Sequence, residues 1–328
     1  MELSKELLID LYTTMVRIRR CDEKVIECLF AGKLITFYHS CQGQEAPGTA
    51  LGRSLRKDDY LYYNHRGHGL PKVLPKGMSP KTFIAEHYGR ATGAAKGYAG
   101  FHNCDIEIGI PGMGGMVGGE ATLAAGTALA CKLRGKGQVT ANMFGDGATG
   151  RGPFHEAMLM SATWKLPLIW CVENNRYQQW TCISLTHPKE DLADFAHGYG
   201  IPSAVVDGQD VIACYEALQP AIERARAGKG PTLLEFKTYR FRPHVEGFPD
   251  FSVQCEGGCR PEFEVEEWKK RDPIKLMEAT LLEKGVLTEA DIERIHREAT
   301  EEMEEADRFS ADSPWPDPKG LDQALYAD

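Results

Sequence analysis

Residues 145–177 read GDGATGRGPFHEAMLMSATWKLPLIWCVENNRY. The apolar, β-prone run 138–144 leads into the Gly-Asp-Gly turn, and apolar residues at helical spacing predict a helix over about 155–165. After Pro167, the apolar run 168–172 predicts a buried strand that ends in Glu-Asn-Asn. We therefore expect a strand, a turn, a helix and a second strand, with polar side chains at the carboxyl ends of both strands.

Those polar side chains have the chemistry of a magnesium-diphosphate site. In an open α/β sheet, the carboxyl ends of the strands border the ligand crevice. Asp146 offers a carboxylate and Asn175 an amide oxygen, which suit Mg²⁺ when phosphate oxygens supply the remaining ligands. Gly145 and Gly147 allow backbone N–H groups to approach a phosphate next to a helix N-terminus.

The spacing of the two motifs resembles a known signature. A lone Gly-Asp-Gly is a common tight turn, but here Glu-Asn-Asn begins 26 residues beyond Gly147. That combination is similar to the thiamine-diphosphate (ThDP) signature. The fuller string GDGA…GxxxEA…LPxxxxxENNxY resembles the alpha subunits of the two-subunit 2-oxo acid dehydrogenases, which act on pyruvate, branched-chain 2-oxo acids or acetoin. The resemblance extends over roughly residues 5–305.

The chain is expected to have an α/β fold. Strand and helix patterns alternate, which indicates a largely parallel sheet, and the resemblance implies the thiamine-diphosphate-binding fold with a helical C-terminal region. We expect one domain over 1–310, with a long N-terminal helix over 4–30, and a loose arm over 311–328. Further helices are predicted over 79–88, 120–133, 192–199, 211–227 and 288–308, with others opening at 43–46 and 272–274, and further strands over 204–206 and 232–237.

Composition excludes several classes of function. The net charge is −9 with no offsetting basic cluster, which argues against nucleic-acid binding. No run approaches the length of a membrane span, and residues 1–9 carry no targeting pattern, so we expect a cytoplasmic protein. The ten cysteines are scattered and expected to be reduced. Only Cys255 and Cys259 form a close pair; free loop thiols are the favoured interpretation and a zinc site is the alternative.

Residues 63–69, YNHRGHG, place two histidines and an arginine among glycines, which suits an anion. Alone, this segment is more typical of a solvated basic turn. By resemblance, His65 and Arg66 contact ThDP, with Arg66 suited to bidentate phosphate contact, and His68 lies near the reacting carbon. His39, just before GQEA at 43–46, is by composition a structural histidine, whereas by resemblance it lines the substrate pocket.

Further cofactor contacts follow from the resemblance. The glycine-rich segment 109–119 indicates close backbone approach to a ligand, and Gly115 and Val117 are expected to bond the ThDP pyrimidine through their backbone. The resemblance assigns the metal to Asp146, Asn175 and the backbone carbonyl of Tyr177. The full set of expected cofactor contacts is His65, Arg66, Gly115, Val117, Asp146, Gly147, Ala148, Asn175, Tyr177 and His244.

The polar stretch over about 239–262 is expected to be a catalytic loop, because it is long for a structureless connection. By resemblance, His244 takes part in catalysis and touches the diphosphate, together with His68 and His39. Pro243 replaces the glycine usual before that histidine. Val245 stands where regulated relatives carry a phosphorylated serine, so that control is not expected here.

The resemblance implies a ThDP- and Mg²⁺-dependent oxidoreductase. An enamine forms on ThDP from a 2-oxo acid or acetoin, and the acyl group passes to a lipoyl-bearing acyltransferase. The activating glutamate comes from a beta subunit, so the chain is expected to be inactive outside an α₂β₂ assembly. The alternatives are a ThDP-dependent carboligase or aldehyde-transferring half-enzyme, and a non-catalytic scaffold subunit. The substrate stays open, since residues 65–69 resemble acetoin-type members and Phe37-Tyr38 resembles branched-chain ones.

Overall fold

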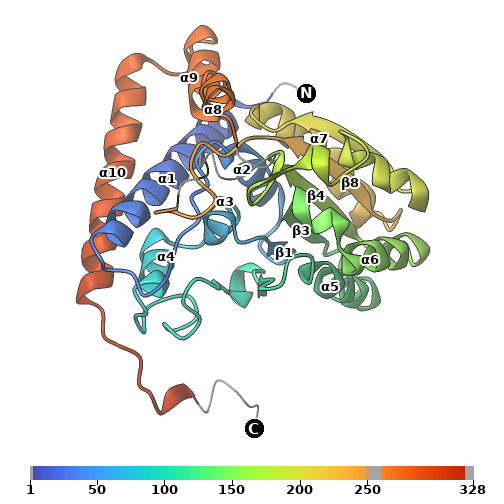
Figure 1. Cartoon of the computed structure of the whole chain (residues 1–328), viewed down its shortest axis with the longest axis horizontal. Helices are drawn as coiled ribbons and strands as arrows, with labels where there is room; N and C mark the ends of the chain where they lie inside the picture. The colour runs from blue at the N-terminus through green and yellow to red at the C-terminus, as the bar shows by residue number, and fades with distance from the viewer. Residues whose placement is uncertain (1–2, 249, 251–259, 322–328) are drawn as a thin grey trace.

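The structure is a computed structural model, and it describes residues 3–248, 250 and 260–321. Within this part of the chain, six parallel strands form a central sheet in the order β2-β1-β3-β4-β8-β7 (Figure 1). The parallel sheet is as expected, and the strands predicted from the sequence are all present. Their bounds are β1 (Tyr60–Tyr63), β2 (Gly112–Met113), β3 (Thr140–Gly145), β4 (Leu168–Asn174), β7 (Ser203–Asp207) and β8 (Thr232–Lys237). Strands β1 and β2 were not predicted, nor was a short antiparallel pair, β5 (Tyr177–Gln178) and β6 (Thr181–Cys182).

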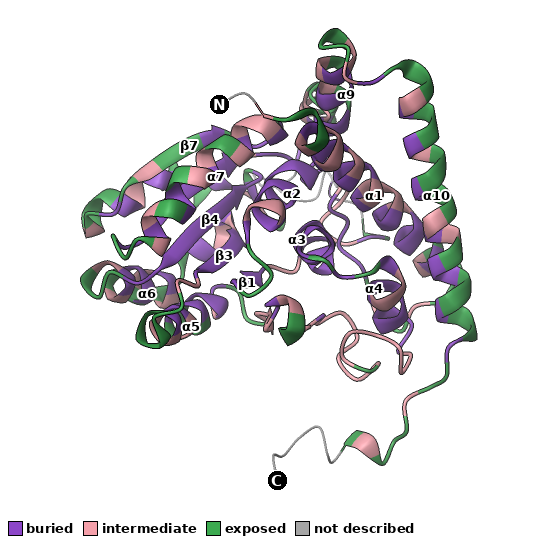
Figure 2. Ribbon diagram, turned by 180° about the vertical axis from the view of Figure 1, so that it is seen from behind, coloured by how far each residue is buried: buried purple, intermediate pink, exposed green. Residues whose placement is uncertain are grey.

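The two faces of the sheet are covered by two separate hydrophobic cores. Side chains alternate between faces along a strand, so Ile169 and Cys171 of β4 join one core, and Leu168, Trp170 and Val172 join the other. Both sides are apolar because helices cover both sides, which is typical of a parallel sheet. Figure 2 shows the central strands β3 and β4 buried along their length, whereas the edge strand β7 is largely exposed.

Helices α5 (Glu120–Arg134) and α6 (Gly152–Thr163) cover one face of the sheet. The other face is covered by a larger group of helices that share one hydrophobic core, and the C-terminal helix of this group packs mainly on other helices, away from the sheet (Figure 1). The helices of that second layer are α1 (Lys5–Phe30), α2 (Glu45–Ser54), α3 (Leu70–Lys76), α4 (Pro80–His87), α7 (Val211–Arg226), α9 (Pro273–Glu283) and α10 (Glu289–Asp312).

The predicted helices form with small shifts at their ends. The Ser4 hydroxyl accepts a hydrogen bond from Leu7 N at 3.2 Å and caps α1, as the sequence suggests. Residues 192–199 wind as a 3₁₀ helix, η5 (Leu192–Tyr199), instead of an α-helix. Helix α8 (Glu262–Lys269) begins where the expected loop ends, and it was not predicted.

The C-terminal segment contacts the domain. Helix α10 continues to Asp312, two residues into the expected arm. Ala91 N then donates to Pro314 O at 2.9 Å, and the guanidinium of Arg90 lies 3.8 Å from the centre of the Trp315 ring. The first residues of the C-terminal segment after α10 are therefore held against the segment that follows α4.

Two further observations bear on the expectations. The described cysteines are all free, whereas Cys255 and Cys259 lie outside the described residues. Among the helices of the described ranges, none combines the length and the apolar character that crossing a bilayer requires.

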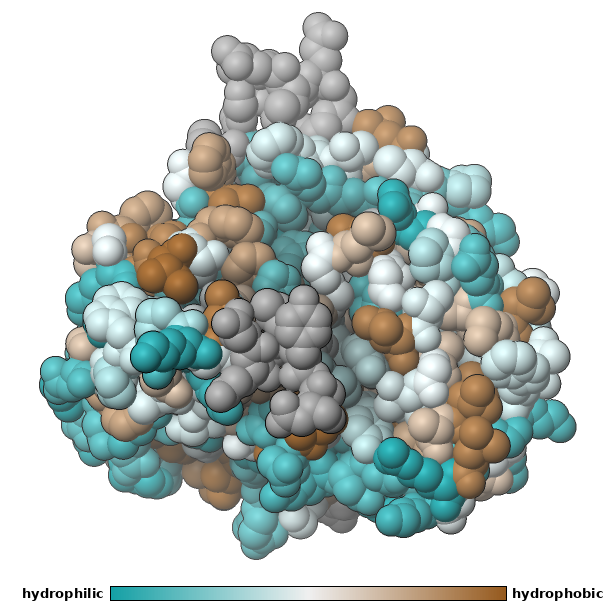
Figure 3. All heavy atoms as spheres, turned by 90° about the horizontal axis from the view of Figure 1, so that it is seen from below, coloured by the Kyte–Doolittle hydropathy of each residue, from teal (hydrophilic) through white to brown (hydrophobic). Residues whose placement is uncertain are grey.

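Figure 3 shows hydrophobic residues exposed in several groups on one face. On helices α5 and α6, the exposed large hydrophobic residues are Leu123, Leu133 and Leu159, and the exposed Trp164 follows directly after α6.

Candidate active site

The expected site residues gather where four neighbouring strands end. In the sheet, Tyr63 of β1 is paired with Met143 of β3, Gly145 of β3 with Glu173 of β4, and Asn174 of β4 with Lys237 of β8. The histidine segment after β1, the Gly-Asp-Gly turn after β3, the Asn-Asn pair of β4 and the loop after β8 therefore emerge side by side. This edge is the one at which ligands bind in open α/β sheets.

Asp146 is a buried carboxylate that lacks a full set of partners. Its side chain is 2% exposed, and its Oδ2 atom has no hydrogen-bond partner among the described residues. Burial raises the pKa of Asp146 to about 7, although a backbone hydrogen bond, Arg240 and Arg66 act in the opposite direction. A buried carboxylate of this kind is stabilised by a bound cation.

Asn175 and Tyr177 lie on the neighbouring strand end. The Oδ1 atom of Asn175 accepts a hydrogen bond from Tyr177 N at 3.1 Å, and its Nδ2 atom faces Gln44 Oε1 at 3.4 Å. Gly147 packs against the adjacent turn, because a Cβ atom added there would lie 3.2 Å from the Gln178 side chain. Ala148 beside it is buried.

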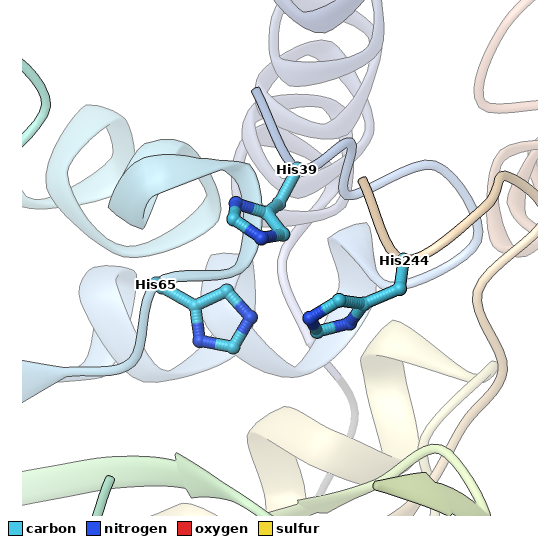
Figure 4. A group of neighbouring side chains, drawn as sticks. All are labelled: His39, His65 and His244. Atoms are coloured by element: carbon cyan, nitrogen blue, oxygen red, sulfur yellow. The ribbon is translucent and has the colours of Figure 1, made fainter. Parts of the chain in front are cut away.

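Three imidazoles converge from three separate segments: His39, His65 and His244 (Figure 4). Ring centroids lie 4.6 Å apart for His39 and His65, 4.9 Å for His39 and His244, and 5.4 Å for His65 and His244. Burial, reinforced by Arg66, lowers the pKa of His39 to about 3 and holds the pKa values of His65 and His244 well below their ordinary range. All three rings are therefore neutral near pH 7.

The neighbours of this cluster are positively charged. Arg66 Nη2 donates to His244 Nδ1 at 3.0 Å, and Arg66 Nη1 contacts the carbonyl oxygens of Ser40 at 3.1 Å and His244 at 3.2 Å. Arg240 is also close enough to act on the pKa values of His39 and His244. Three neutral imidazoles could by geometry hold a metal ion, but two guanidinium groups beside them favour an anion.

His68 lies behind His39, apart from the open cluster. It is fully buried, and its Nε2 atom is 3.0 Å from His39 Nδ1. Its Nδ1 atom is 3.1 Å from the Nε2 atom of His87, a residue that the sequence did not single out. His68 thus contacts the pocket through His39 in this arrangement.

The loop after β8 is held by one buried carboxylate. The backbone N–H of His244 lies 3.0 Å from Asp250 Oδ1, and Asp250 also forms ion pairs with Arg240 and Arg260. The part of the expected catalytic loop that contains Ser252, Cys255 and Cys259 lies outside the described residues.

The glycine-rich segment reaches the Gly-Asp-Gly turn through Gly118. A Cβ atom added to Gly118 would lie 3.5 Å from Ala148 O. Val117 is 54% exposed, and a Cβ atom added to Gly115 would lie 3.4 Å from His102 Nε2. Gly115 and Val117 therefore stand at the rim of the site, open to a molecule that approaches from outside the chain.

Sequence reasoning missed several polar residues that support the site. Glu173 and Lys72 form a fully buried ion pair at 2.7 Å, and Asn64 Nδ2 donates to the same Glu173 oxygen at 2.8 Å. This pair links the end of β4 to the histidine segment. Gln44 is fully buried beside Asn175, and its place within GQEA was the only signal in the sequence.

The unpartnered polar atoms fit a cofactor that carries both a cation and an anion. Within the described ranges, buried atoms without a hydrogen-bond partner include Asp146 Oδ2, Gln44 Nε2 and His65 Nε2. A carboxylate oxygen suits a divalent cation, and an amide N–H group suits an anionic oxygen. Metal-bound diphosphate has both properties.

Comparison with known proteins agrees with this geometry. Residues 13–319 match the family described as dehydrogenase E1 component. The chain is 36% identical to the alpha subunit of acetoin:2,6-dichlorophenolindophenol oxidoreductase of Bacillus subtilis, over 99% of this chain and 95% of the relative. It is 35% identical to the subunit of the same name from Cupriavidus necator, again over 99% and 95%. It is 36% identical to the pyruvate dehydrogenase E1 component subunit alpha of Rhizobium meliloti, over 96% and 89%.

These matches confirm the resemblance to alpha subunits that the motifs indicated. The names of the relatives do not favour a carboligase or a scaffold subunit. The chain therefore belongs to the dehydrogenase E1 component family of thiamine-diphosphate-dependent oxidoreductases.

Proposed function

We propose that the chain, together with a beta subunit, binds ThDP and Mg²⁺ at the carboxyl edge of the sheet and acts there on acetoin or a 2-oxo acid such as pyruvate. When bound, ThDP supplies a carbon nucleophile for the substrate carbonyl. The observation that carries the proposal is the buried Asp146 carboxyl group, whose Oδ2 atom has no hydrogen-bond partner among the described residues and whose pKa is influenced by Arg240 and Arg66.

Asp146, the Asn175 amide oxygen and the backbone carbonyl of Tyr177 would hold the metal. The three donors are hard oxygens, which Mg²⁺ prefers. Burial makes the isolated Asp146 carboxylate unfavourable, so a bound cation is also favoured by the electrostatics of the site. Gly147 and Ala148 would bring the backbone of the turn against the same group.

Arg66 and His65 would hold the diphosphate. Arg66 is buried, and it already donates to His244, so an anion bound there would contact a side chain in a fixed position. Gly115 and Val117 would contact the rest of the cofactor through their backbone at the rim of the site.

His39 and His244 would act on the substrate and His68 would support them. Each neutral imidazole has one unprotonated ring nitrogen, which can accept a proton from the substrate and then return it, as general acid-base catalysis requires.

The beta subunit would complete the site and supply the carboxylate that activates the cofactor. The large apolar side chains on the outer surfaces of α5 and α6 fit such a contact, because exposed apolar groups of this size mark protein interfaces. An α₂β₂ assembly and transfer of the acyl group to a lipoyl-bearing acyltransferase are parts of the same proposal, as is a cytoplasmic location.

Calorimetry of ThDP with MgCl₂ tests the proposal directly. The chain would be measured alone and as the complex co-purified with its beta subunit, in wild-type form and as Asp146→Ala. The matched control is Asp312→Ala, the same substitution at an exposed position at the end of α10. We expect binding by the wild-type and Asp312→Ala complexes and none by Asp146→Ala.

Turnover would then be followed with acetoin, pyruvate and branched-chain 2-oxo acids. The acceptor is 2,6-dichlorophenolindophenol, which is named in two relatives. Equal binding by the Asp146→Ala complex would refute the metal assignment. Absence of binding by every preparation would refute the cofactor proposal, and turnover by the lone chain would refute the need for a beta subunit.

A further inference from the structure

Three histidines form a hydrogen-bonded row that leads away from the pocket. His39 Nδ1 contacts His68 Nε2 at 3.0 Å, and His68 Nδ1 contacts His87 Nε2 at 3.1 Å. The row ends where His87 Nδ1 contacts the backbone carbonyl oxygen of Phe83 at 3.0 Å. His87 is the last residue of α4 and has no place in the function derived so far.

The last contact decides the direction of every hydrogen bond in the row. A carbonyl oxygen only accepts, so His87 Nδ1 must carry a proton. In a neutral ring the other nitrogen is then an acceptor, and His87 Nε2 accepts from His68 Nδ1. By the same step His68 Nε2 accepts from His39 Nδ1. His39 is left with a bare Nε2 atom.

The surroundings keep the row neutral. His68 and His87 are fully buried, and the Tyr38 ring meets the edges of both at centroid distances of 4.9 Å and 5.9 Å. The Phe101 ring stacks on His68 at 4.5 Å. Burial lowers the pKa of His87 to about 4 and keeps that of His68 well below its ordinary range. A second proton on either ring is therefore disfavoured at neutral pH.

The free edge of His39 faces the other two imidazoles of the cluster, His65 and His244. Its Nδ1 atom is engaged by His68, and no described residue hydrogen-bonds its Nε2 atom. Figure 4 shows the His39 ring directed toward the space between His65 and His244.

His244 has the opposite polarity. Arg66 can only donate, so the His244 Nδ1 atom that it contacts at 3.0 Å is an acceptor. Neutral His244 therefore carries its proton on Nε2. His39 thus presents a hydrogen-bond acceptor, Nε2, at the cluster, and His244 presents a donor, Nε2–H.

We propose that His87 is a positioning residue, which acts through His68 to hold His39 in the tautomer that presents an unprotonated Nε2 atom to the substrate. A hydroxyl group that must lose a proton, or an acid that must donate one, would meet an acceptor there. This inference rests on the proposed function, because it takes His39 as a substrate-facing group.

Two substitutions at position 87 separate positioning from packing. His87→Leu fills similar space but cannot accept from His68, whereas the amide oxygen of His87→Gln can. The control is His155→Leu, since His155 bonds Tyr199 outside the row. We expect the complex of His87→Leu with its beta subunit to lose about tenfold or more in kcat, the usual effect of removing the partner that orients a functional histidine. Its KM for ThDP should stay near the wild-type value, and His87→Gln should recover most of the activity.

Nitrogen NMR provides a readout that needs neither substrate nor cofactor. Only this chain would carry ¹⁵N-histidine in the assembled complex, and the ring couplings report which nitrogen holds the proton. The wild-type and His87→Gln complexes should have Nδ1–H on both His39 and His68, and His87→Leu should have a mixture of tautomers.

The outcomes distinguish this inference from the function on which it rests. Nε2–H on wild-type His39 would overturn the inference even if the enzyme is active. Equal loss of kcat in His87→Leu and His87→Gln with unchanged tautomers would also overturn it, because the loss of activity would then be caused by altered packing. A wild-type complex that fails to bind ThDP would overturn the proposed function while leaving the tautomer measurement valid.

Discussion

Substitution of Asp250 is expected to release the loop that carries His244. The Asp250 carboxylate pairs with Arg240 and Arg260, and it also accepts hydrogen bonds from the backbone N–H of His244 and the indole N–H of Trp180. The carboxylate and both arginine side chains are almost completely buried. Asp250→Ala would remove from the buried Arg240 guanidinium group the carboxylate with which it pairs.

The magnitude follows from that burial. Loss of one partner from a buried ion pair costs about 3–5 kcal/mol, because the remaining charge is left uncompensated. Burial, and then the nearby Arg66 and Arg260, already lower the pKa of Arg240 to about 9, and Asp250 is the group that opposes this effect. Each 1.4 kcal/mol is about a factor of ten in population, so the open form of the loop should rise between about 100-fold and a few thousand-fold.

Hydrogen exchange followed by mass spectrometry measures this opening. Peptides within 238–248 should exchange faster in Asp250→Ala by that factor, while peptides from α1 should be unchanged. Asp250→Asn, which keeps the shape of the side chain but not its charge, should give an intermediate rate. Wild-type exchange rates in Asp250→Ala would refute the reasoning, since they would mean that the arginines do not depend on this carboxylate.

Three further predictions concern stability. Lys72→Met should lower the free energy of unfolding by about 3–5 kcal/mol, because Glu173 would be left buried and charged. Adding Glu173→Gln to the same chain should restore part of this free energy. Urea unfolding measures both effects, and an unchanged midpoint in Lys72→Met would contradict the assignment. The free energy of unfolding should fall as pH drops from about 6.5 toward 4. In the unfolded chain, histidines take up protons near pH 6.5, whereas folding lowers the pKa of His87 to about 4 and that of His39 to about 3. Each such histidine adds up to about 1.4 kcal/mol per pH unit to this slope, so urea unfolding of His87→Gln at pH 5 and 7 should give a shallower slope, and an equal slope would count against the burial of His87. Arg90→Ala should speed proteolysis after residue 313 without shifting the main unfolding transition, because it removes a cation–π contact with Trp315 worth about 0.5–1 kcal/mol; intact tails in a timed digest would be the contrary result.

Local patterns were sufficient to predict the framework. The strand over 232–237 was found at its observed bounds, and the strand over 138–144 was found within two residues, because both are short apolar runs between turn residues. The Gly-Asp-Gly and Asn-Asn motifs also identified which strand ends carry polar ligands. Parallel pairing then brings those ends together at one edge of the sheet.

Local patterns could not predict which polar groups would be buried together. His87 lies 19 residues from His68, and His68 lies 29 residues from His39, so their row depends on how α4 packs beneath the histidine segment. The same holds for the contact between Asp250 and the loop after β8. Residues 192–199 show that sequence patterns are limited even for local structure, because the helical pattern there does not distinguish a 3₁₀ helix from an α-helix.

The amino-acid order alone thus determined four of the six strands in the described sheet, most of the helices, the family motifs and the residues that we propose to bind a metal-diphosphate group. Only tertiary packing decided the protonation of those residues and the direction in which their hydrogen bonds point. The physical reason is that a pKa or a tautomer depends on burial and on neighbouring charges, which come from segments far apart in the chain.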